Sequence, residues 1–272
     1  MAPSPEANPR TVHLCERLLR RWDPMFSRTV DPTRDHRTAA ILATLADRPS
    51  GPHRVLELGS GPGPLTERML ERFPKCRVVS VDIDPVLLHV GRVALRRFQR
   101  RTTWVLADLR RQGWSTALPR ARFDVAVSSL TLHWLEEKEI RSVYRTLRTL
   151  VCPGGLVVEG DFLPARAPKE PLKRPTKTTT PPRSSERDPR ELRAFKVQWG
   201  EWWGALASDP SMHAPLRERQ VRLPGPFPPR RTSGPKAPAP LEFHVEALRD
   251  AGFQEPTVVW QDRGFRVLVA VR

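Results

Sequence analysis

Short, almost continuously apolar segments alternate with helical patterns between residues 54 and 163, and this alternation constrains the fold more than any other feature. Apolar segments separated by helices are typical of a parallel sheet covered on both faces. Right-handed crossovers place the carboxyl ends of such strands at one edge of the sheet, where ligands bind. The predicted strands are residues 54–58, 77–82, 102–108, 123–130 and 156–162, and the helices between them are residues 64–73, 85–101 and 136–150.

The C-terminal segment adds to this sheet. Residues 241–253 predict a helix that ends at Gly252. Residues 257–261 and 265–272 flank a tight connection that contains a glycine, which is typical of an antiparallel strand pair. The expected fold class is α/β. It is a doubly wound, mostly parallel seven-stranded sheet, Rossmann-like, with an antiparallel C-terminal strand pair and a Pro/Arg-rich insertion.

Changes in composition divide the chain into four parts. The first is helical, with breaks expected at Asp23-Pro24 and Asp31-Pro32. The third is rich in proline and basic residues around one helix, residues 191–209, which carries three tryptophans. Such a segment cannot bury a core of its own, so we expect a loose insertion and a candidate lid. The parts are residues 1–50, an N-terminal helical cap; 51–163, the alternating core; 164–240, the Pro/Arg-rich insertion; and 241–272, the helix and strand pair that complete the core sheet.

The net charge of +16 is the most unusual property of the composition. A balance this basic favours nucleic acid or an acidic membrane face as a partner. Most of the 46 basic residues are arginine, however, and arginine, proline, alanine and glycine are what G+C-rich codons encode. The base composition of the gene accounts for much of the charge, so nucleic acid is a partner that we do not favour.

Membrane, disulfide and metal sites find no support in the sequence. No apolar segment approaches the ~18 residues that cross a membrane, and the N-terminal MAPSPEANPR lacks the apolar part of a signal peptide. We therefore expect a cytoplasmic protein without a membrane partner. Cys15, Cys76 and Cys152 are scattered and form neither a CxxC pair nor an even set, so we expect no disulfide framework and no metal.

A glycine-rich loop, ELGSGPG at residues 57–63, follows the first predicted strand and precedes a helix. Glycines let a ligand approach the backbone, and the free N–H groups of the following helix attract an anion. A dinucleotide site has the spacing G-x-G-x-x-G, which fails here because the third glycine would fall at Pro64 or at Thr66. The observed spacing is G-x-G-x-G, with Glu57 two positions before Gly59. An acid at that position suits a ligand with a cationic amino group.

In this loop the chain resembles the class I S-adenosylmethionine-dependent methyltransferases, whose first motif is E/D-x-G-x-G-x-G. Asp82, in VVSVDIDP, lies 23 positions after Gly59 at the end of the second predicted strand, and Asp108, in VLADLR, ends the third. A carboxylate suits a vicinal diol, and an offset of ~20 residues is what one βαβ step produces. The resemblance implies S-adenosylmethionine as the cofactor, with Asp82 on both ribose hydroxyls and Asp108 on the adenine amino group.

The resemblance extends to the fourth and fifth predicted strands. FDVAVSSLTLHWL, residues 123–135, is similar to the family's fourth strand, whose end lies beside the methionine part of the cofactor and the substrate. The LHWL string and the C-terminal pattern EALRDAGFQEPTVVW resemble most the small-molecule group, such as trans-aconitate methyltransferase. The implied cofactor-binding residues are Glu57, Gly59, Ser60, Gly61, Gly63, Asp82, Ile83, Asp108, Leu109 and Ser128, with Ile83 and Leu109 packed on the adenine.

Each of these residues also has a purely structural interpretation. The glycines alone would form a tight turn, and Glu57 would be a solvated charge at the end of a strand. Asp82 would cap the helix that begins at residue 85, a role for which Asp84 competes. Asp108 would cap a short helix.

His133 is the one histidine expected beside the site, just after the fourth strand. Histidine side chains ordinarily titrate near pH ~6.5, which suits a general base. A hydroxyl acceptor requires such a base and a carboxylate acceptor does not. The alternative is a histidine that packs or orients the substrate. Three residues that precede the core are candidates for contacting a substrate carboxylate: Arg34, Asp35 and Arg37.

The expected function is therefore methyl transfer to a small-molecule acceptor, with a carboxylate or a hydroxyl as the candidate group. Two alternatives stay open: an RNA methyltransferase that uses the basic surface, and a cofactor-binding protein without catalysis. Amino-methylating nucleic-acid enzymes carry a D/N/S-P-P-Y/F/W string after the fourth strand, whereas this chain reads SSLT at residues 128–131. No pattern in the sequence encodes the methylated atom or the oligomeric state.

Overall fold

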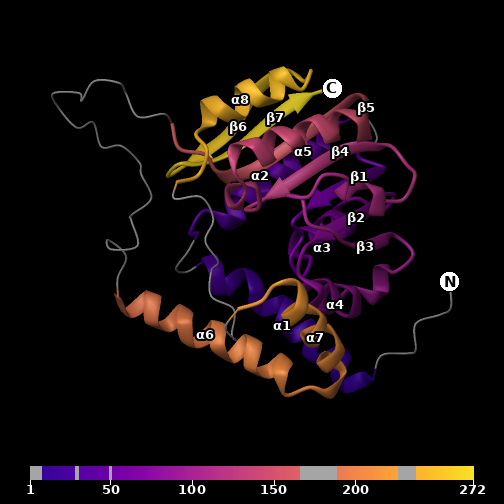
Figure 1. Ribbon diagram of the computed structural model, residues 1–272, viewed down its shortest axis with the longest axis vertical. Coiled ribbons are helices and arrows are strands. Elements are labelled where there is room, and N and C mark those ends of the chain that lie inside the picture. Colours follow the sequence, from indigo (N-terminus) through magenta and orange to yellow (C-terminus); the bar gives the residue numbers. More distant parts are fainter. Residues whose placement is uncertain (1–7, 28–30, 49–50, 166–188, 226–236) are drawn as a thin grey trace.

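The computed structural model describes residues 8–27, 31–48, 51–165, 189–225 and 237–272 (Figure 1). Its centre is a seven-stranded sheet with the strand order β3-β2-β1-β4-β5-β7-β6. Neighbouring strands from β3 to β5 are parallel, and β7 runs antiparallel to both β5 and β6, so the expected sheet is confirmed. The strands are β1 (Arg54–Leu58), β2 (Arg77–Asp82), β3 (Thr102–Leu106), β4 (Phe123–Ser129), β5 (Val151–Phe162), β6 (Gln254–Asp262) and β7 (Phe265–Val271).

One strand begins earlier than its sequence predicts. Residues 152–155 contain a proline and two glycines and predict a turn, yet β5 already starts at Val151, which pairs with Phe123. The end of β7 explains the difference, because the Gly154 N–H donates to the Arg272 carbonyl and the Arg272 N–H donates to the Gly155 carbonyl, both at 2.9 Å. The register shifts beyond Phe123, so the glycines form an irregular start of the strand.

Helices cover both faces of the sheet (Figure 1). Apolar residues of α2 and α3, among them Ile41 and Met69, pack on one face, and those of α5 and α8, among them Val143 and Ala247, pack on the other. These four side chains are at most 1% exposed, so both faces are buried. The helices are α1 (Pro9–Ser27), α2 (Arg34–Ala46), α3 (Pro64–Arg72), α4 (Pro85–Ala94), α5 (Glu137–Leu150), α6 (Pro189–Ala207), α7 (His213–Arg222) and α8 (Leu241–Asp250).

A second apolar cluster joins α1 and α6 to α4, and α7 also packs on α4 (Figure 1). Leu18 of α1, Val90 of α4 and Trp202 of α6 are fully buried in this cluster. Trp202 Nε1 also donates a hydrogen bond to the Leu18 carbonyl at 3.0 Å. The prediction of a loose insertion around one helix needs correction, because the described part of residues 164–240 contains both α6 and α7, packed on the core. Its Pro-rich segments 166–188 and 226–236 lie outside the described residues.

Pro24 does not break α1, contrary to prediction. It lies in the last turn of the helix, which ends at Ser27, so the disturbance that a proline causes affects only this turn. Trp22 packs against Phe26 across this turn, with the ring centroids 5.0 Å apart, and holds the helical path. The break at Asp31-Pro32 is confirmed, since it falls between the end of α1 and the start of α2.

None of the helices in the described ranges combines the length and the apolar character needed to span a membrane. The three cysteines are free thiols: Cys15 and Cys76 are buried, and Cys152 is half-buried. Burial raises the pKa of Cys15 and of Cys76 to about 12, so both are protonated and serve as packing groups in the core.

Candidate active site

The glycine-rich loop connects the end of β1 to α3 at the carboxyl edge of the sheet. Gly59, Gly61 and Gly63 have φ angles of 66°, 55° and 89°, in the left-handed region that favours glycine. Space is short as well, because a Cβ added at Gly59 would overlap Thr131 and lie 2.7 Å from its Cβ. The three glycines are thus required by backbone angle, and Gly59 is required a second time by its neighbour.

Contacts from two other elements border this loop. The Ser60 N–H donates to the Val81 carbonyl of β2 at 3.0 Å. On another side, a Cβ added at Gly61 would lie 3.6 Å from the ring of Trp22, so α1 lies against the loop. The Trp22 ring in turn packs on Trp202 of α6, with centroids 5.1 Å apart. The apolar cluster of α1, α4 and α6 therefore extends from the insertion to the backbone of the loop.

Asp82 ends β2 beside the loop, and two backbone N–H groups hold its carboxylate. Gly61 donates to Oδ2 at 2.7 Å, and Asp84 donates to Oδ1 at 2.9 Å. Each oxygen keeps a lone pair for a further donor, which fits the two hydroxyls of a ribose. Burial raises the pKa of Asp82 to about 6, so the group is mostly ionised at neutral pH. The alternative role of helix cap belongs to Asp84, whose Oδ1 accepts from the Val86 N–H at 2.9 Å.

Glu57 lies beneath the loop. It is 3% exposed, and its carboxyl accepts a hydrogen bond from Thr66 Oγ1 of α3, which also lies 2.8 Å from Ser80 Oγ. Burial raises the pKa of Glu57 to about 8, so the carboxyl is mostly protonated at neutral pH. The interpretation as a solvated strand-end charge is therefore wrong, and the buried group braces β1 against α3. A direct contact with a cationic amino group stays a prediction that this burial does not favour.

Asp108 follows β3, and the neighbouring Arg110 occupies its carboxylate. Arg110 donates from Nε to Oδ1 at 2.8 Å and from Nη2 to Oδ2 at 2.9 Å. Burial would raise the pKa of Asp108, but these bonds from Arg110 outweigh it and lower the pKa below its ordinary value. The residues expected around the adenine differ in exposure, since Ile83 is half-buried and Leu109 is buried in the core of the sheet. The adenine contacts of all three stay predictions.

The end of β4 combines a buried hydroxyl with a strained backbone. Ser128 pairs with Leu58, the residue before Gly59, and is 3% exposed. Its Oγ has no hydrogen-bond partner among the residues that the structure describes, which is rare for a buried hydroxyl and fits a polar ligand group. Leu130 has a φ of 54°, and its N–H is held by the Gly160 carbonyl at 3.0 Å. Strain of this kind concentrates at functional sites.

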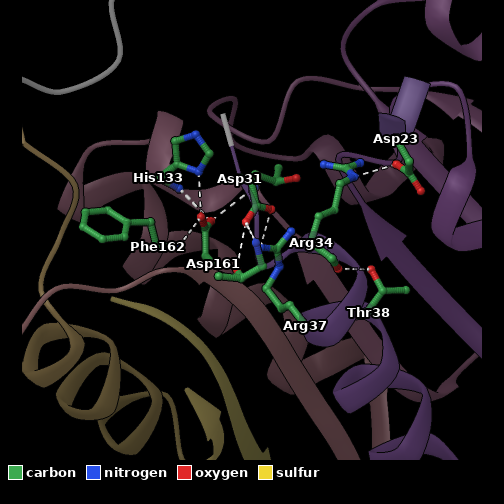
Figure 2. A network of polar contacts seen from close by, with 10 residues as sticks. Asp23, Asp31, Arg34, Arg37, Thr38, His133, Asp161 and Phe162 are labelled. Atoms are coloured by element: carbon green, nitrogen blue, oxygen red, sulfur yellow. Dashed lines mark hydrogen bonds and ion pairs between the residues drawn. The ribbon is translucent and has the colours of Figure 1, made fainter. Parts of the chain in front are cut away.

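His133 lies in the short helix η3 (Leu132–Trp134) and pairs with Asp161 of β5 (Figure 2). His133 Nδ1 is 2.7 Å from Asp161 Oδ1, and the backbone N–H groups of His133 and Thr131 each donate to Oδ2 at 3.2 Å. Asp161 is fully buried, which opposes its ionisation, but His133 and these bonds outweigh burial and lower its pKa. An ionised Asp161 accepts from Nδ1–H, which leaves Nε2 free to take a proton. We refer to this pair as the dyad.

A second ion pair lies next to the dyad (Figure 2). Arg37 Nη1 is 2.5 Å from Asp31 Oδ2, and both side chains are at most 1% exposed. Arg34 is paired instead with Asp23 at 2.6 Å, and the side chain of Asp35 is 73% exposed. Among the three candidates for meeting a substrate carboxylate, Arg37 is thus the buried cation beside the dyad. Its Nε and Nη2 have no partner in the described part of the chain.

Two residues of this site were not predicted. Asp161 stands near the end of LVVEGDF, and an acid at the end of an apolar strand was the available signal. Its partner His133 is 28 residues earlier, and only the parallel pairing of β4 with β5 brings the two together. Thr131 carries no sequence signal at all, since its role comes from its contact with Gly59.

Comparison with known proteins supports the expected family. A family model described as a methyltransferase domain matches residues 55–155. A trans-aconitate 2-methyltransferase from Azoarcus sp. is 34% identical over 126 residues, 45% of each chain. A malonyl-[acyl-carrier protein] O-methyltransferase from Halorhodospira halophila is 33% identical over 119 residues, 42% of this chain and 36% of the other. These matches span less than half the length of the two relatives.

Solved structures are similar over more of the chain. An O-methyltransferase family protein from Burkholderia thailandensis has a TM-score of 0.55 at 16% identity and covers 89% of this chain and 57% of its own. Human N-acetylserotonin methyltransferase, solved with S-adenosylmethionine, has a TM-score of 0.52 at 15% identity, with 97% and 57% covered. At these identities the likeness concerns the fold alone. Together, the matched domain and the curated relatives show that residues 55–155 are similar to methyltransferases, and the solved structures show a similar fold over more of the chain.

Proposed function

We propose that this protein is a cytoplasmic enzyme that transfers a methyl group from S-adenosylmethionine to a small-molecule acceptor. The observation that carries the proposal is that the dyad adjoins the glycine-rich loop at one edge of the sheet. Thr131 connects the two, since it packs against Gly59 and lies two residues before His133. A cofactor site and a proton-accepting side chain would therefore be neighbours. The free cysteines support a reducing compartment.

The cofactor contacts that we propose follow from what each residue offers. Asp82 accepts from the ribose hydroxyls, because each of its oxygens has a lone pair left. The backbone of the loop would face the methionine part, and so would Ser128 Oγ, which has no partner among the described residues. Asp108, Ile83 and Leu109 border the adenine, and the adenine amino group would share the Asp108 carboxylate with Arg110. Glu57 supports the loop from below.

When bound, S-adenosylmethionine supplies an electrophilic methyl group on a sulfonium sulfur. The protein must then place the acceptor in line, exclude water and remove a proton where the acceptor carries one. We propose that His133 Nε2 accepts the proton of a hydroxyl acceptor. Asp161 holds the imidazole through Nδ1 and stabilises the imidazolium that forms. With a carboxylate acceptor no proton moves, and the dyad would serve to orient it.

A carboxylate is the first acceptor class to test. The names of two relatives specify trans-aconitate and a malonyl group, both of which carry carboxylates. In this chain, Arg37 offers a buried positive charge beside the dyad with two N–H groups that have no partner among the described residues. We further propose that the helical cluster of α1, α6 and α7 caps the site, because Trp22 borders the loop.

The proposal is tested by a radiolabelled methyl-transfer screen over carboxylic acids, phenols, amines and RNA. We expect labelled product from a small molecule and none from RNA. Labelling of RNA alone would favour the nucleic-acid alternative. A protein that binds S-adenosylhomocysteine but labels nothing in a broad panel would favour the non-catalytic alternative.

Two substitutions then test the proposed role of the dyad in proton transfer. With a hydroxyl acceptor, His133→Ala and Asp161→Asn should each lower kcat by roughly 10²–10⁴, the range of general acid–base catalysis. Both variants should bind S-adenosylhomocysteine like wild type, since neither side chain belongs to the proposed cofactor contacts. An unaltered kcat in His133→Ala would remove this histidine from the mechanism.

A further inference from the structure

Arg219, on α7 of the insertion, reaches the turn that follows β2. Its Nε donates to Asp84 Oδ2 at 2.6 Å, and its guanidinium lies over the Trp203 ring, with Cζ 5.1 Å from the ring centroid. The side chains of Arg219 and Asp84 are only 10% and 8% exposed. The insertion therefore makes a buried, charge-assisted hydrogen bond two residues away from Asp82, and the mechanism proposed above does not use it.

Asp84 is the residue through which this contact can act on the cofactor site. Its other oxygen, Oδ1, accepts from the N–H groups of Val86 and Leu87 at 2.9 and 3.4 Å and caps α4. Its own N–H donates to Asp82 Oδ1 at 2.9 Å. The position of Asp84 thus determines both the start of α4 and one of the two bonds that orient Asp82.

The charge of Asp84 depends on Arg219. Burial raises the pKa of Asp84 above its ordinary value even though the guanidinium opposes this shift. Without Arg219, the buried carboxylate would take up a proton or turn toward water, and either change would disturb the cap and the turn that presents Asp82. A lysine would supply the charge but lack the flat guanidinium that lies on Trp203.

We propose that Arg219 is a positioning residue for the cofactor. Through Asp84 it holds Asp82 in the orientation that accepts the ribose hydroxyls, so the insertion is a structural part of the nucleoside site. This inference rests on the proposed function, since it takes Asp82 as the ribose ligand.

The test is the dissociation constant of S-adenosylhomocysteine, measured by titration calorimetry on the full chain. Arg219→Met keeps a long side chain beside Trp203, and we expect the Kd to rise about tenfold, the effect of losing one hydrogen bond between the Asp82 carboxylate and the ribose. Arg219→Lys should recover part of this loss. Arg217→Met is the matched control, because Arg217 is exposed on the same helix, and it should leave the Kd unchanged. Thermal melting of each variant without ligand monitors the fold.

A double-mutant cycle separates positioning from a general structural role. If Arg219 acts through Asp82, Arg219→Met should change the Kd less than about twofold in the Asp82→Asn background. A folded Arg219→Met variant with the wild-type Kd would overturn the inference, and so would losses that add fully in the cycle.

A second variant tests the same inference if Arg219→Met does not fold. Asp84→Asn keeps a good helix cap but removes the charge that pairs with Arg219, and we expect a similar rise in the Kd. An unchanged Kd in folded Asp84→Asn would also overturn the inference. Wild-type protein that fails to bind S-adenosylhomocysteine would instead refute the proposed function itself.

Discussion

Replacing Gly59 by alanine probes the close approach between the loop and Thr131. Gly59 and Gly154 have similar φ angles of 66° and 72°, so alanine meets a similar backbone penalty at both positions. That penalty is about 1–2 kcal/mol for a left-handed residue. At Gly154 a new Cβ would have no neighbour within 4 Å, whereas at Gly59 it would overlap Thr131. Overlap in a packed region adds roughly 1–3 kcal/mol. We therefore expect Gly59→Ala to lower the free energy of unfolding by about 2–5 kcal/mol and Gly154→Ala by about 1–2 kcal/mol.

Urea unfolding of both variants measures this difference. Both alanine substitutions are then repeated in a Thr131→Gly background. This background lacks every Thr131 side-chain atom that the new Cβ at residue 59 would meet. The loss from Gly59→Ala should then fall to that from Gly154→Ala. In the protein that keeps Thr131, equal losses of stability from Gly59→Ala and Gly154→Ala would refute the conclusion that Thr131 closes the space beside Gly59.

Two further predictions depend on pH. The pKa of Asp82 is about 6, and the ribose hydroxyls need its ionised form, so the Kd of S-adenosylhomocysteine should rise about tenfold as the pH is lowered from 7.5 to 5. Asp82→Asn should show no such change. A wild-type Kd that does not vary with pH would contradict this prediction. The pKa of Glu57 is raised from 4.5 to about 8, so the folded state holds a proton that the unfolded state releases, and the free energy of unfolding should fall as pH rises through this window. Glu57→Gln lacks this loss, and its stability relative to wild type should therefore increase from pH 5 to pH 8 in urea unfolding; a constant difference would show that Glu57 does not titrate there.

The parts of the fold that follow from apolar patterning were predictable from the sequence. β1 and β2 have the predicted bounds, because both strands are buried on both faces, and they end at the glycine-rich loop and at Asp82 respectively. The glycines of the loop were equally predictable, since their spacing reflects backbone angles that few other residues adopt. The competition between Asp82 and Asp84 for the helix cap was also visible, although only the structure assigns the cap to Asp84.

The parts that depend on polar burial were not predictable. α7, HAPLRERQVR, has few apolar residues, and its buried position is occupied by Arg219, which hydrophobic periodicity does not detect. Glu57 reads as an acid at the end of a strand, and only the packing of α3 decides that it is buried and mostly protonated. The dyad follows from the pairing of β4 with β5, a tertiary feature that no local pattern contains.

The central claim is that the loop and Asp82 form an S-adenosylmethionine site. Titration calorimetry with S-adenosylhomocysteine tests it most directly. We predict one site per chain in the wild type and a Kd at least about tenfold higher in Asp82→Ala, since that change removes hydrogen bonds to a charged acceptor. No binding heat from folded wild-type protein, or the same Kd in folded Asp82→Ala, would contradict the claim.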